Sequence, residues 1–515
     1  MKKYMKIFAV IVFMTSFFGC DSFLEEDPKV LLTPENFYKT IGDLKAAVNS
    51  INAQMFDGAI GGRDGQNRLS VPGAARSYQM HIGADDLTTK NNGTKTQWVP
   101  IDQFNPTSVT IFIERAGWKI PYDVIYQCNN IIERKDDIEG NEDEIDQYVA
   151  LAYFWRGWAY FHATRFYGDI PIIINSDINL SADIARSPVI DVYQQIESDL
   201  LEALKYLPDS WQTETAYPDA YALKTLLADF YITWAGWPIK DTSKYVTAAS
   251  YAEDVMLNSG AALLPDFADL WRYDVMGTYD DHQETIFDIV FLTREQIGSN
   301  DRARAIGRQF IPPEERNGFS DFFCEVGFFN RFPEGYRKDV TFKTEHNGVP
   351  WQDFVEAHPY YKKFRGSYDY LNSRNAQSGA NFMVYRYADV LLLYAEAKAM
   401  SSGPDASAYE AINKVRRRAN NLPVDTPDIS VDLTTGLSQI DFRDAVIDER
   451  AWEFAGEQRR WYDLVRTEKV AESVSGKDPS DVQPASVAPL LDTYLFPIPF
   501  SDIQQNPNIQ QNTGY

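Results

Sequence analysis

The chain has 515 residues, with 49 lysines and arginines against 74 aspartates and glutamates, and a formal net charge of −25 at pH 7. Nucleic acids and anionic lipid surfaces would repel so acidic a chain, which disfavours both as partners and favours neutral or cationic ligands. Its three cysteines are too few for a disulfide framework and lack CxxC-type metal spacing.

Residues 1–19 have the layout of a secretory signal peptide. Lys2, Lys3 and Lys6 precede an apolar run from Ile7 to Phe18. That run is shorter than the roughly 20 residues that span a bilayer, so it predicts a signal sequence and not a membrane anchor.

Cys20 follows a small residue at the end of this run, which resembles the lipobox of bacterial lipoproteins, where the cysteine is diacylated. Phe17 and Phe18 depart from the leucine and small residue usual there, and ordinary secretion with an incidental cysteine is the alternative. A diacyl anchor holds a protein stably, because each buried CH₂ contributes about 0.8 kcal/mol. We therefore predict lipidation at Cys20 and a tether over residues 20–35, which are acidic and interrupted by proline.

The body, residues 36–515, is predicted to be a single helical unit. A first helix is expected over 33–52, with Thr33 as its N-cap and Pro34 at its first position. Glycine, asparagine and other polar residues predict mostly loop from Asp57 to Asn105. Apolar spacings of three and four predict further helices over 118–134, 144–167, 192–207, 217–234, 245–258, 387–401, 406–420 and 442–454.

Two features of these helices indicate the architecture. The helix over 144–167 has apolar residues on both sides, which predicts that it is buried between neighbouring helices. Gly168 is expected to end it. Short connections pair 217–234 with 245–258 and 387–401 with 406–420, which suggests degenerate tetratricopeptide-like hairpins. Residues 265–381 break this pattern. The expected fold class is all-α, with tetratricopeptide-like repeats and a large irregular, loop-rich insertion.

Cys128 and Cys324 lie in apolar surroundings, within a predicted helix and directly after two phenylalanines. A disulfide bond between them could form in an oxidising compartment, but two buried free thiols are the favoured interpretation.

Several segments together resemble the SusD/RagB family of surface lipoproteins, which partner TonB-dependent outer-membrane transporters. They are CDSFLEEDP from position 20, RGWAYFHATRFYGDIPII from 156, YRYADVLLLYAEA from 385, AINKVRRRA from 411, DERAWEFAGEQRRWYDLVR from 448 and YLFPIPFSDIQQNPNIQQNTGY from 494. The resemblance implies an all-α core with four tetratricopeptide-like units facing a SusC-like transporter. It also implies ligand binding on variable regions, about 57–105 and 265–381 in this chain.

The segment from 448 carries three glutamates, Glu449, Glu453 and Glu457, among several arginines. They are candidates for catalytic acids, but nearly balanced charges flanked by aromatic residues favour a buried ion-pair network that joins the C-terminal segment to the helical core. His162, in mid-helix among aromatics, is expected to be a core histidine with its hydrogen bonds satisfied. No hydrolase, metalloprotease or nucleotide-binding motif occurs.

No metal ligand set is predicted from the histidines, and no cofactor is expected. A structural calcium ion would use Asp85-Asp86 or Asp280-Asp281, although ordinary loop acids are the simpler interpretation of both pairs.

Aromatic residues in polar loops are the best candidates for ligand contact, since one face of a sugar ring packs on an aromatic plane while its hydroxyls bond amides and charged groups. The candidate ligand-binding residues, chosen on this chemistry alone, are Trp98, Asn91, Trp271, Tyr273, Tyr336 and Trp351.

The resulting hypothesis is an outer-membrane, lipid-anchored protein at the cell surface. It would bind an oligosaccharide without catalysis and deliver it to a partner transporter, acting as its lid. One alternative is the same scaffold binding peptides or glycopeptides. A less favoured alternative is an α-helical glycoside hydrolase, which needs two carboxylates roughly 5–9 Å apart across a cleft, one with a raised pKa.

Overall fold

The structure is a computed structural model that describes residues 37–56, 78–89, 98–110, 113–176, 184–211, 217–272, 283–289, 320–365, 381–485 and 489–515. Within these ranges helices dominate, and the short strands pair in twos. The predicted all-α fold class is therefore confirmed. The signal peptide, Cys20 and the tether lie outside the described residues and remain predictions.

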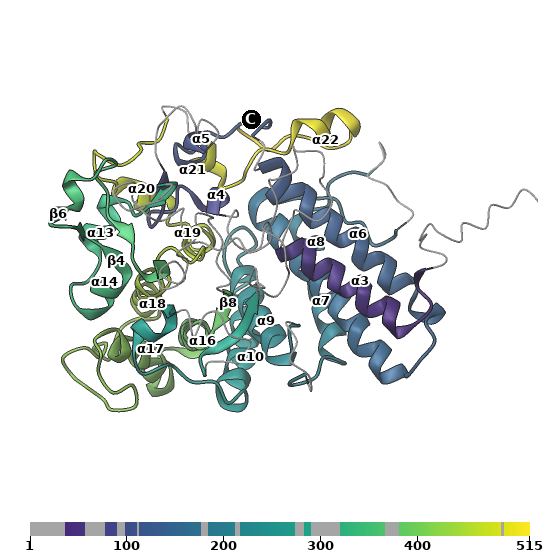
Figure 1. The fold of residues 1–515 in the computed structure, drawn as a ribbon, viewed down its shortest axis with the longest axis horizontal. Coiled ribbons are helices and arrows are strands. Elements are labelled where there is room, and N and C mark those ends of the chain that lie inside the picture. The colour runs from purple at the N-terminus through teal and green to yellow at the C-terminus, as the bar shows by residue number, and fades with distance from the viewer. Residues whose placement is uncertain are drawn as a thin grey trace, which may run out of the picture.

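Four helices form one side of the molecule, coloured purple to blue in Figure 1. They are α3 (Ile41–Phe56), α6 (Ile120–Glu133), α7 (Glu142–Tyr167) and α8 (Val189–Leu204). α7 packs against the other three and is buried on both sides, as predicted. The Asn141 side chain accepts the Glu144 N–H at its start, and Gly168, with φ of 71°, ends it.

Five further helices pack in sequence beside this layer. They are α9 (Ala220–Trp234), α10 (Lys244–Asn258), α16 (Tyr387–Ser402), α17 (Ala406–Ala419) and α18 (Gln439–Glu453). α10 contacts both α9 and α16, and α16 contacts both α17 and α18. Both predicted hairpin pairs are thus confirmed. The fully buried Ala395, Ala397 and Ala399 let α16 approach its neighbours closely.

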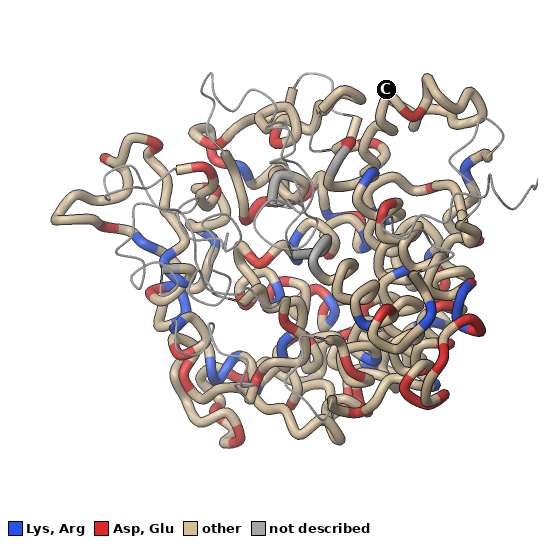
Figure 2. Tube along the Cα trace, turned by 45° about the vertical axis from the view of Figure 1, so that its right-hand side comes forward, with Lys and Arg blue, Asp and Glu red and all other residues tan. Residues whose placement is uncertain are grey.

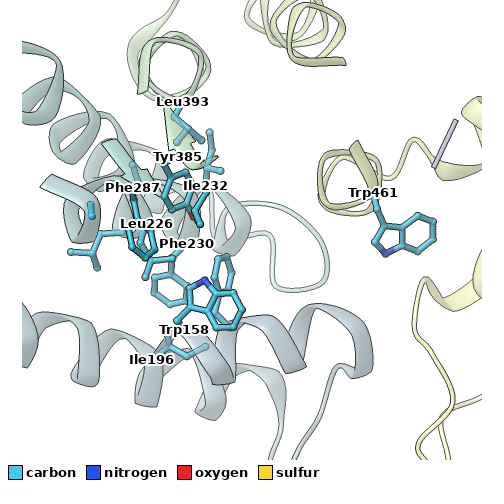
Figure 3. Close-up of a cluster of buried hydrophobic side chains, with 14 of the residues drawn as sticks. Trp158, Ile196, Leu226, Phe230, Ile232, Phe287, Tyr385, Leu393 and Trp461 are labelled. Carbon is cyan, nitrogen blue, oxygen red and sulfur yellow. The ribbon is translucent and has the colours of Figure 1, made fainter. Parts of the chain in front are cut away.

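The apolar core lies between these helices. Figure 3 shows Trp158 of α7 and Ile196 of α8 near Leu226 and Phe230 of α9, with Leu393 of α16 on the far side of the cluster. The antiparallel strands β2 (Thr285–Ile289) and β8 (Phe382–Arg386) add to this core, and β8 leads directly into α16.

The described part of residues 265–381 is made of short elements. They are η4 (Phe267–Trp271), β2, β3 (Phe322–Phe323), α13 (Val326–Arg331), α14 (Tyr336–Thr341), β4 (Phe342–Lys343), β5 (Glu345–His346), β6 (Val349–Pro350), η6 (Trp351–Asp353), β7 (Tyr360–Tyr361) and η7 (Lys363–Arg365). β4 pairs with β7 and β5 with β6, while β3 pairs with β1 (Thr88–Thr89). Figure 1 shows α13, α14, β4 and β6 on the side opposite the first helical layer.

Some predicted boundaries were wrong. The helix expected over 33–52 is interrupted by a turn and a bridge at residues 38–40, and α3 begins at Ile41; residues 33–36 lie outside the described chain. A π-helix, η2 (Ile113–Lys119), precedes α6 and was not predicted, because its wider turn shifts the apolar spacing. The expected loop from Asp57 to Asn105 also contains α4 (Tyr78–His81), β1 and α5 (Val99–Asp102).

The chain ends in short segments that pack over the helices. They are α19 (Arg460–Arg466), α20 (Val470–Ser475), α21 (Pro489–Thr493) and α22 (Phe500–Gln505). Cys128 and Cys324 are free and buried, which confirms the favoured interpretation, and burial raises the pKa of both thiols. None of the helices described is both long enough and apolar enough to cross a membrane.

Candidate ligand groove

Glu453, one of the three glutamates of the C-terminal motif, lies at the centre of a buried ion-pair network. It accepts hydrogen bonds from Arg337 at 2.9 Å and from Arg386 and Arg418 at 2.5 Å each. Burial raises the pKa of this carboxyl, but the three guanidinium groups outweigh it and hold the pKa well below its usual range.

The other two glutamates extend the same network. Glu449 accepts from Arg337 at 2.7 Å, and Glu457 accepts from Lys363 at 2.6 Å and from Arg386. The pKa of Glu457 is lowered too, because Arg386 and Lys363 outweigh burial. A general acid needs a raised pKa, so Glu453 and Glu457 have the opposite electrostatics, and the predicted structural network is confirmed.

An open groove of about 800 Å³ lies in the irregular region, at the edge of the molecule that carries α13, α14 and β4 (Figure 1). Its lining residues are Phe329, Glu334, Lys338, Asp339, Phe342, Lys343, Thr344, Glu345 and Lys362. Ligand pockets typically measure about 300–1,000 Å³, so the groove has room for an oligomeric ligand.

Aromatic rings form one wall of the groove. The Phe329 ring meets Phe342 edge to face at 5.2 Å and Trp351 at 5.7 Å. The Lys338 ammonium lies 4.2 Å from the Phe329 ring centre, and the Trp351 backbone N–H donates to the Thr344 carbonyl. Trp351 is half-buried and lies beside the lining residues Phe329 and Thr344.

Apart from Thr344, charged residues form the rest of the lining. The six charged residues are three lysines and three acids, so their formal charges cancel. Lys338 is fixed by Glu334 at 2.6 Å, and Lys362 by the Asp339 carbonyl at 3.0 Å. Across the molecule, acidic and basic positions are likewise interspersed (Figure 2). The lining offers donors and acceptors to a neutral polar ligand without an excess of either charge.

The β5–β6 hairpin flanks the groove. Its turn residues Asn347 and Gly348 have φ of 50° and 81°, which is the left-handed backbone that two-residue hairpins require. This asparagine-glycine pair was the one local signal that could have located the hairpin in the sequence.

Two of the predicted ligand residues are buried. Trp98 is 8% exposed and stacks on Phe322 at 5.1 Å, and Trp271 is 4% exposed against Phe364. The expectation that aromatics in these loops would be exposed is therefore wrong for both. Tertiary packing covers the rings, and the Lys363 ammonium already lies 4.5 Å from the Trp271 ring.

Of the other four predicted ligand residues, two lie near the groove and two lie outside the described residues. Tyr336 and Trp351 lie within the irregular region of the groove, but the Tyr336 hydroxyl donates to Asp266, and its pKa is raised to about 12 by burial and by that carboxylate. Asn91 and Tyr273 lie outside the described residues. Phe329, Lys338 and Lys362 were missed, since neither aromatic content nor charge distinguishes a lining residue from a core or surface one.

The calcium interpretation finds no support in the described chain. Asp85 is bound by Arg460 at 2.7 Å and by Arg331 at 3.0 Å, and Asp86 accepts the Gly456 N–H. No group of three or more histidine, cysteine or acidic side chains suited to a metal ion occurs among the described residues. The Asp280-Asp281 pair lies outside them.

Two family models match the chain. One, described as the SusD family, matches residues 339–515, and the other, described as starch-binding associating with outer membrane, matches residues 23–232. Among curated proteins, the SusD-like protein P2 of Formosa agariphila is 29% identical over 534 aligned positions that span the whole of both chains.

Solved structures share the fold. A SusD homolog from Bacteroides thetaiotaomicron superposes with a TM-score of 0.76 at 24% identity, over 93% of this chain and 98% of that one. Surface glycan-binding protein A from the same species, in complex with laminarihexaose, gives a TM-score of 0.71 at 19% identity, over 93% and 100%. At sequence identities this low, the similarity to these two structures establishes a shared fold.

Proposed function

The chain belongs to the SusD-like family, and from this premise we propose that it is a cell-surface protein that captures an oligosaccharide. The observation that carries the proposal is the likeness over the whole chain to this family. Surface glycan-binding protein A, which has the same fold, was solved with laminarihexaose bound.

The groove is the proposed binding site. A neutral oligosaccharide would pack a sugar face against Phe329 or Trp351 and place its hydroxyls against the lysine and carboxylate groups of the lining. The cancelled charge of the lining supports a neutral ligand over a strongly charged one.

The finer proposal concerns anchoring and delivery. Diacylated Cys20 would hold the protein at the outer membrane, and the tether over residues 20–35 would let it cover a SusC-like TonB-dependent transporter as a lid. Cys20→Ala should release the protein from the membrane fraction, and a tagged wild-type chain should co-purify with a transporter from detergent extracts. Membrane retention of Cys20→Ala would contradict the lipid anchor.

We also propose that the protein does not act on its ligand chemically. One structural neighbour named above is a surface glycan-binding protein, and Glu453 and Glu457 are held as carboxylates within the ion-pair network. Cleaved glycan after incubation with the purified chain would contradict this and would favour the glycoside hydrolase alternative.

The test is a calorimetric screen of the purified chain from residue 21, which lacks the lipidation site, against plant, microbial and host glycans, with product analysis of every hit. Binding of an intact glycan would support the proposal. Silence across the panel, together with binding of peptides or glycopeptides, would move the ligand class to the alternative.

A matched pair of substitutions would locate the site. Phe329→Ala, in the groove wall, should weaken glycan binding roughly tenfold, as expected for loss of one aromatic contact. Phe500→Ala removes the same side chain from an exposed position on α22, away from α13 and α14 (Figure 1), and should leave affinity unchanged. Equal affinities in the two variants would exclude the groove as the site.

A further inference from the structure

A second, smaller cavity lies where α4, α7, α9, β8 and the chain around α18 and α19 meet. Its volume is about 60 Å³, and its lining includes His81, His162, Arg165, Asp229, Tyr385 and Arg450. At roughly 30 Å³ per water molecule, it has room for about two waters or a ligand of a few non-hydrogen atoms. None of its lining residues belongs to the groove.

Four residues of this cavity each carry a buried nitrogen without a hydrogen-bond partner. They are Nδ1 of His81, Nε2 of His162, Nε of Arg165 and Nη1 of Arg450. The two histidines are 3% exposed and Arg450 is 4% exposed. A buried polar atom left unpaired costs about 1–3 kcal/mol, so four around one cavity indicate a missing hydrogen-bonding ligand.

The Arg165 guanidinium is held in a fixed orientation. Its central carbon lies 3.9 Å from the Phe161 ring centre and 3.5 Å from that of Tyr462, so aromatic rings cover it. Hydrogen-bond donors of a guanidinium lie in its plane, and Nη1 is 3.7 Å from Asp229. The Nε–H is therefore a preset donor without a partner.

The cavity carries no unbalanced positive charge. Each lining arginine has its own carboxylate: Arg165 has Asp229, Arg450 has Asp463 at 2.8 Å, and Arg459 has Asp389 at 3.2 Å. A bound anion would need an unpaired positive charge beside it, and these ion pairs leave none among the lining arginines. The ligand must instead be uncharged.

His162 supplies an acceptor. Burial and the nearby Arg165 lower the pKa of His162 to about 3, so the ring is neutral at pH 7. One ring nitrogen bonds the Ala116 backbone, which leaves the Nε2 lone pair as the unpaired group. His162 is thus buried as predicted, but its hydrogen bonds are not satisfied by protein, contrary to expectation.

We propose that this cavity binds uncharged hydroxyl groups, which accept from Arg165 Nε–H and Arg450 Nη1–H and donate to His162 Nε2. A hydroxyl group is both donor and acceptor, so it fits this set, whereas an anion lacks the donor and an ammonium lacks the acceptor. Water and a small organic alcohol, such as the hydroxymethyl arm of a sugar, share this chemistry. The inference does not depend on glycan binding in the groove.

Crystals of the full mature chain in three conditions test the proposal. Without additive, ordered density should bridge His162 Nε2 and Arg165 Nε. After an ethylene glycol soak, replacement of that density by the diol identifies organic hydroxyls as ligands, and unchanged density identifies water. A cavity without density, or an anomalous bromide signal there after a sodium bromide soak, would overturn the proposal.

Crystals of a matched pair of variants and one solution measurement extend the test. His162→Phe keeps an aromatic ring over Trp158, which stacks on His162 at 5.2 Å, but removes the acceptor. It should lose the density near position 162, while His346→Phe, in the β5–β6 hairpin, should keep it. If His162→Phe does not fold, the ¹⁵N shift of His162 Nε2 in the wild-type chain decides: a shift for a bonded lone pair supports the proposal, and one for a free lone pair overturns it.

Discussion

The first helical layer and the irregular region over residues 320–365 are ordered by different forces. In the layer, fully buried apolar side chains such as Leu151, Phe154 and Phe161 recur along α7, and burial of this kind contributes about 1.5–3 kcal/mol per large side chain. In the irregular region the strands are two residues long, too short to stabilise themselves.

Buried ion pairs hold the irregular region against the helical core. Arg337 of α14 bonds Glu449 and Glu453 of α18, and Lys363 bonds Glu457. Glu325, just before α13, pairs with Lys477. These contacts connect the groove to the helical core at defined points, and a ligand site can thus be built on irregular backbone.

Such a network has an asymmetric energetic effect. Replacing a whole buried ion pair by apolar residues is often neutral, but removing one partner costs about 3–5 kcal/mol, because the other charges stay buried and unpaired. Single charge deletions in this network should therefore strongly destabilise the packing of the irregular region on the helical core.

Glu453→Gln is expected to have the largest effect. It leaves Arg337, Arg386 and Arg418 facing a neutral side chain, and the free energy of unfolding in urea should fall by about 3–5 kcal/mol. The control is Glu472→Gln, at an exposed glutamate that pairs with Lys469, and it should cost less than about 1 kcal/mol. Similar losses in both variants would contradict the role of the network.

Leu200→Ala tests the helical layer. Leu200 of α8 is fully buried, and its truncation should lower the free energy of unfolding by about 2–5 kcal/mol through lost burial and a cavity. Leu257→Ala, at a side chain 69% exposed on α10, should change it by less than about 0.5 kcal/mol. Hydrogen exchange should show α7 and α8 losing protection in the first variant; a loss confined to residues 320–365 would contradict the comparison.

Asp86 gives the free energy of unfolding a pH dependence. Burial raises the pKa of its carboxyl from 3.8 to about 7, so the folded chain keeps a proton that the unfolded chain releases. Stability from this group is present below pH 3.8 and is lost as pH rises toward 7. Asp86→Asn should remove this loss, so that its stability relative to wild type improves by at least about 1 kcal/mol between pH 4 and pH 7.

The check on Asp86→Asn is denaturant unfolding at several pH values. The side-chain amide oxygen of this variant can still accept the Gly456 N–H, so the backbone contact is kept. Asp353→Asn, at an exposed position in η6, serves as the control and should follow the wild-type profile. A variant profile parallel to wild type would show that Asp86 does not titrate in this window.

The smallest effect is expected in the groove. Trp351→Ala should weaken glycan affinity about tenfold, or about 1.4 kcal/mol, measured by calorimetry with the best glycan of the screen. Val355→Ala, 73% exposed nearby, is the control and should bind as wild type does. Unchanged affinity in Trp351→Ala would remove this ring from the proposed site.

The sequence predicted the helical part well because helical periodicity is local. Spacings of three and four identified α7, α9, α10, α16 and α17, and Gly168 marked the end of α7. The buried free thiols also followed from their neighbours in the chain. The charges beside Glu453 and Glu457 predicted that both would form ion pairs, although their partner Arg386 lies 67 and 71 positions away.

Burial of loop aromatics was decided by the tertiary structure. Trp98 and Trp271 lie in polar sequence, yet each is covered by rings distant in the chain, Phe322 and Phe364. Nothing near either tryptophan encodes these contacts. Loop composition alone therefore overestimates how many aromatics are free to meet a ligand.

By itself the sequence determined the all-α class, the helix pairs and the family resemblance, since these depend on residues within one or two turns of each other or on contiguous motifs. Only the tertiary structure decided which charges pair and where a groove opens. Arg337 and Glu449 meet across 112 positions, and Arg460 and Asp85 across 375. Contacts at such separations form when the whole chain packs, so they leave no periodic trace in the sequence.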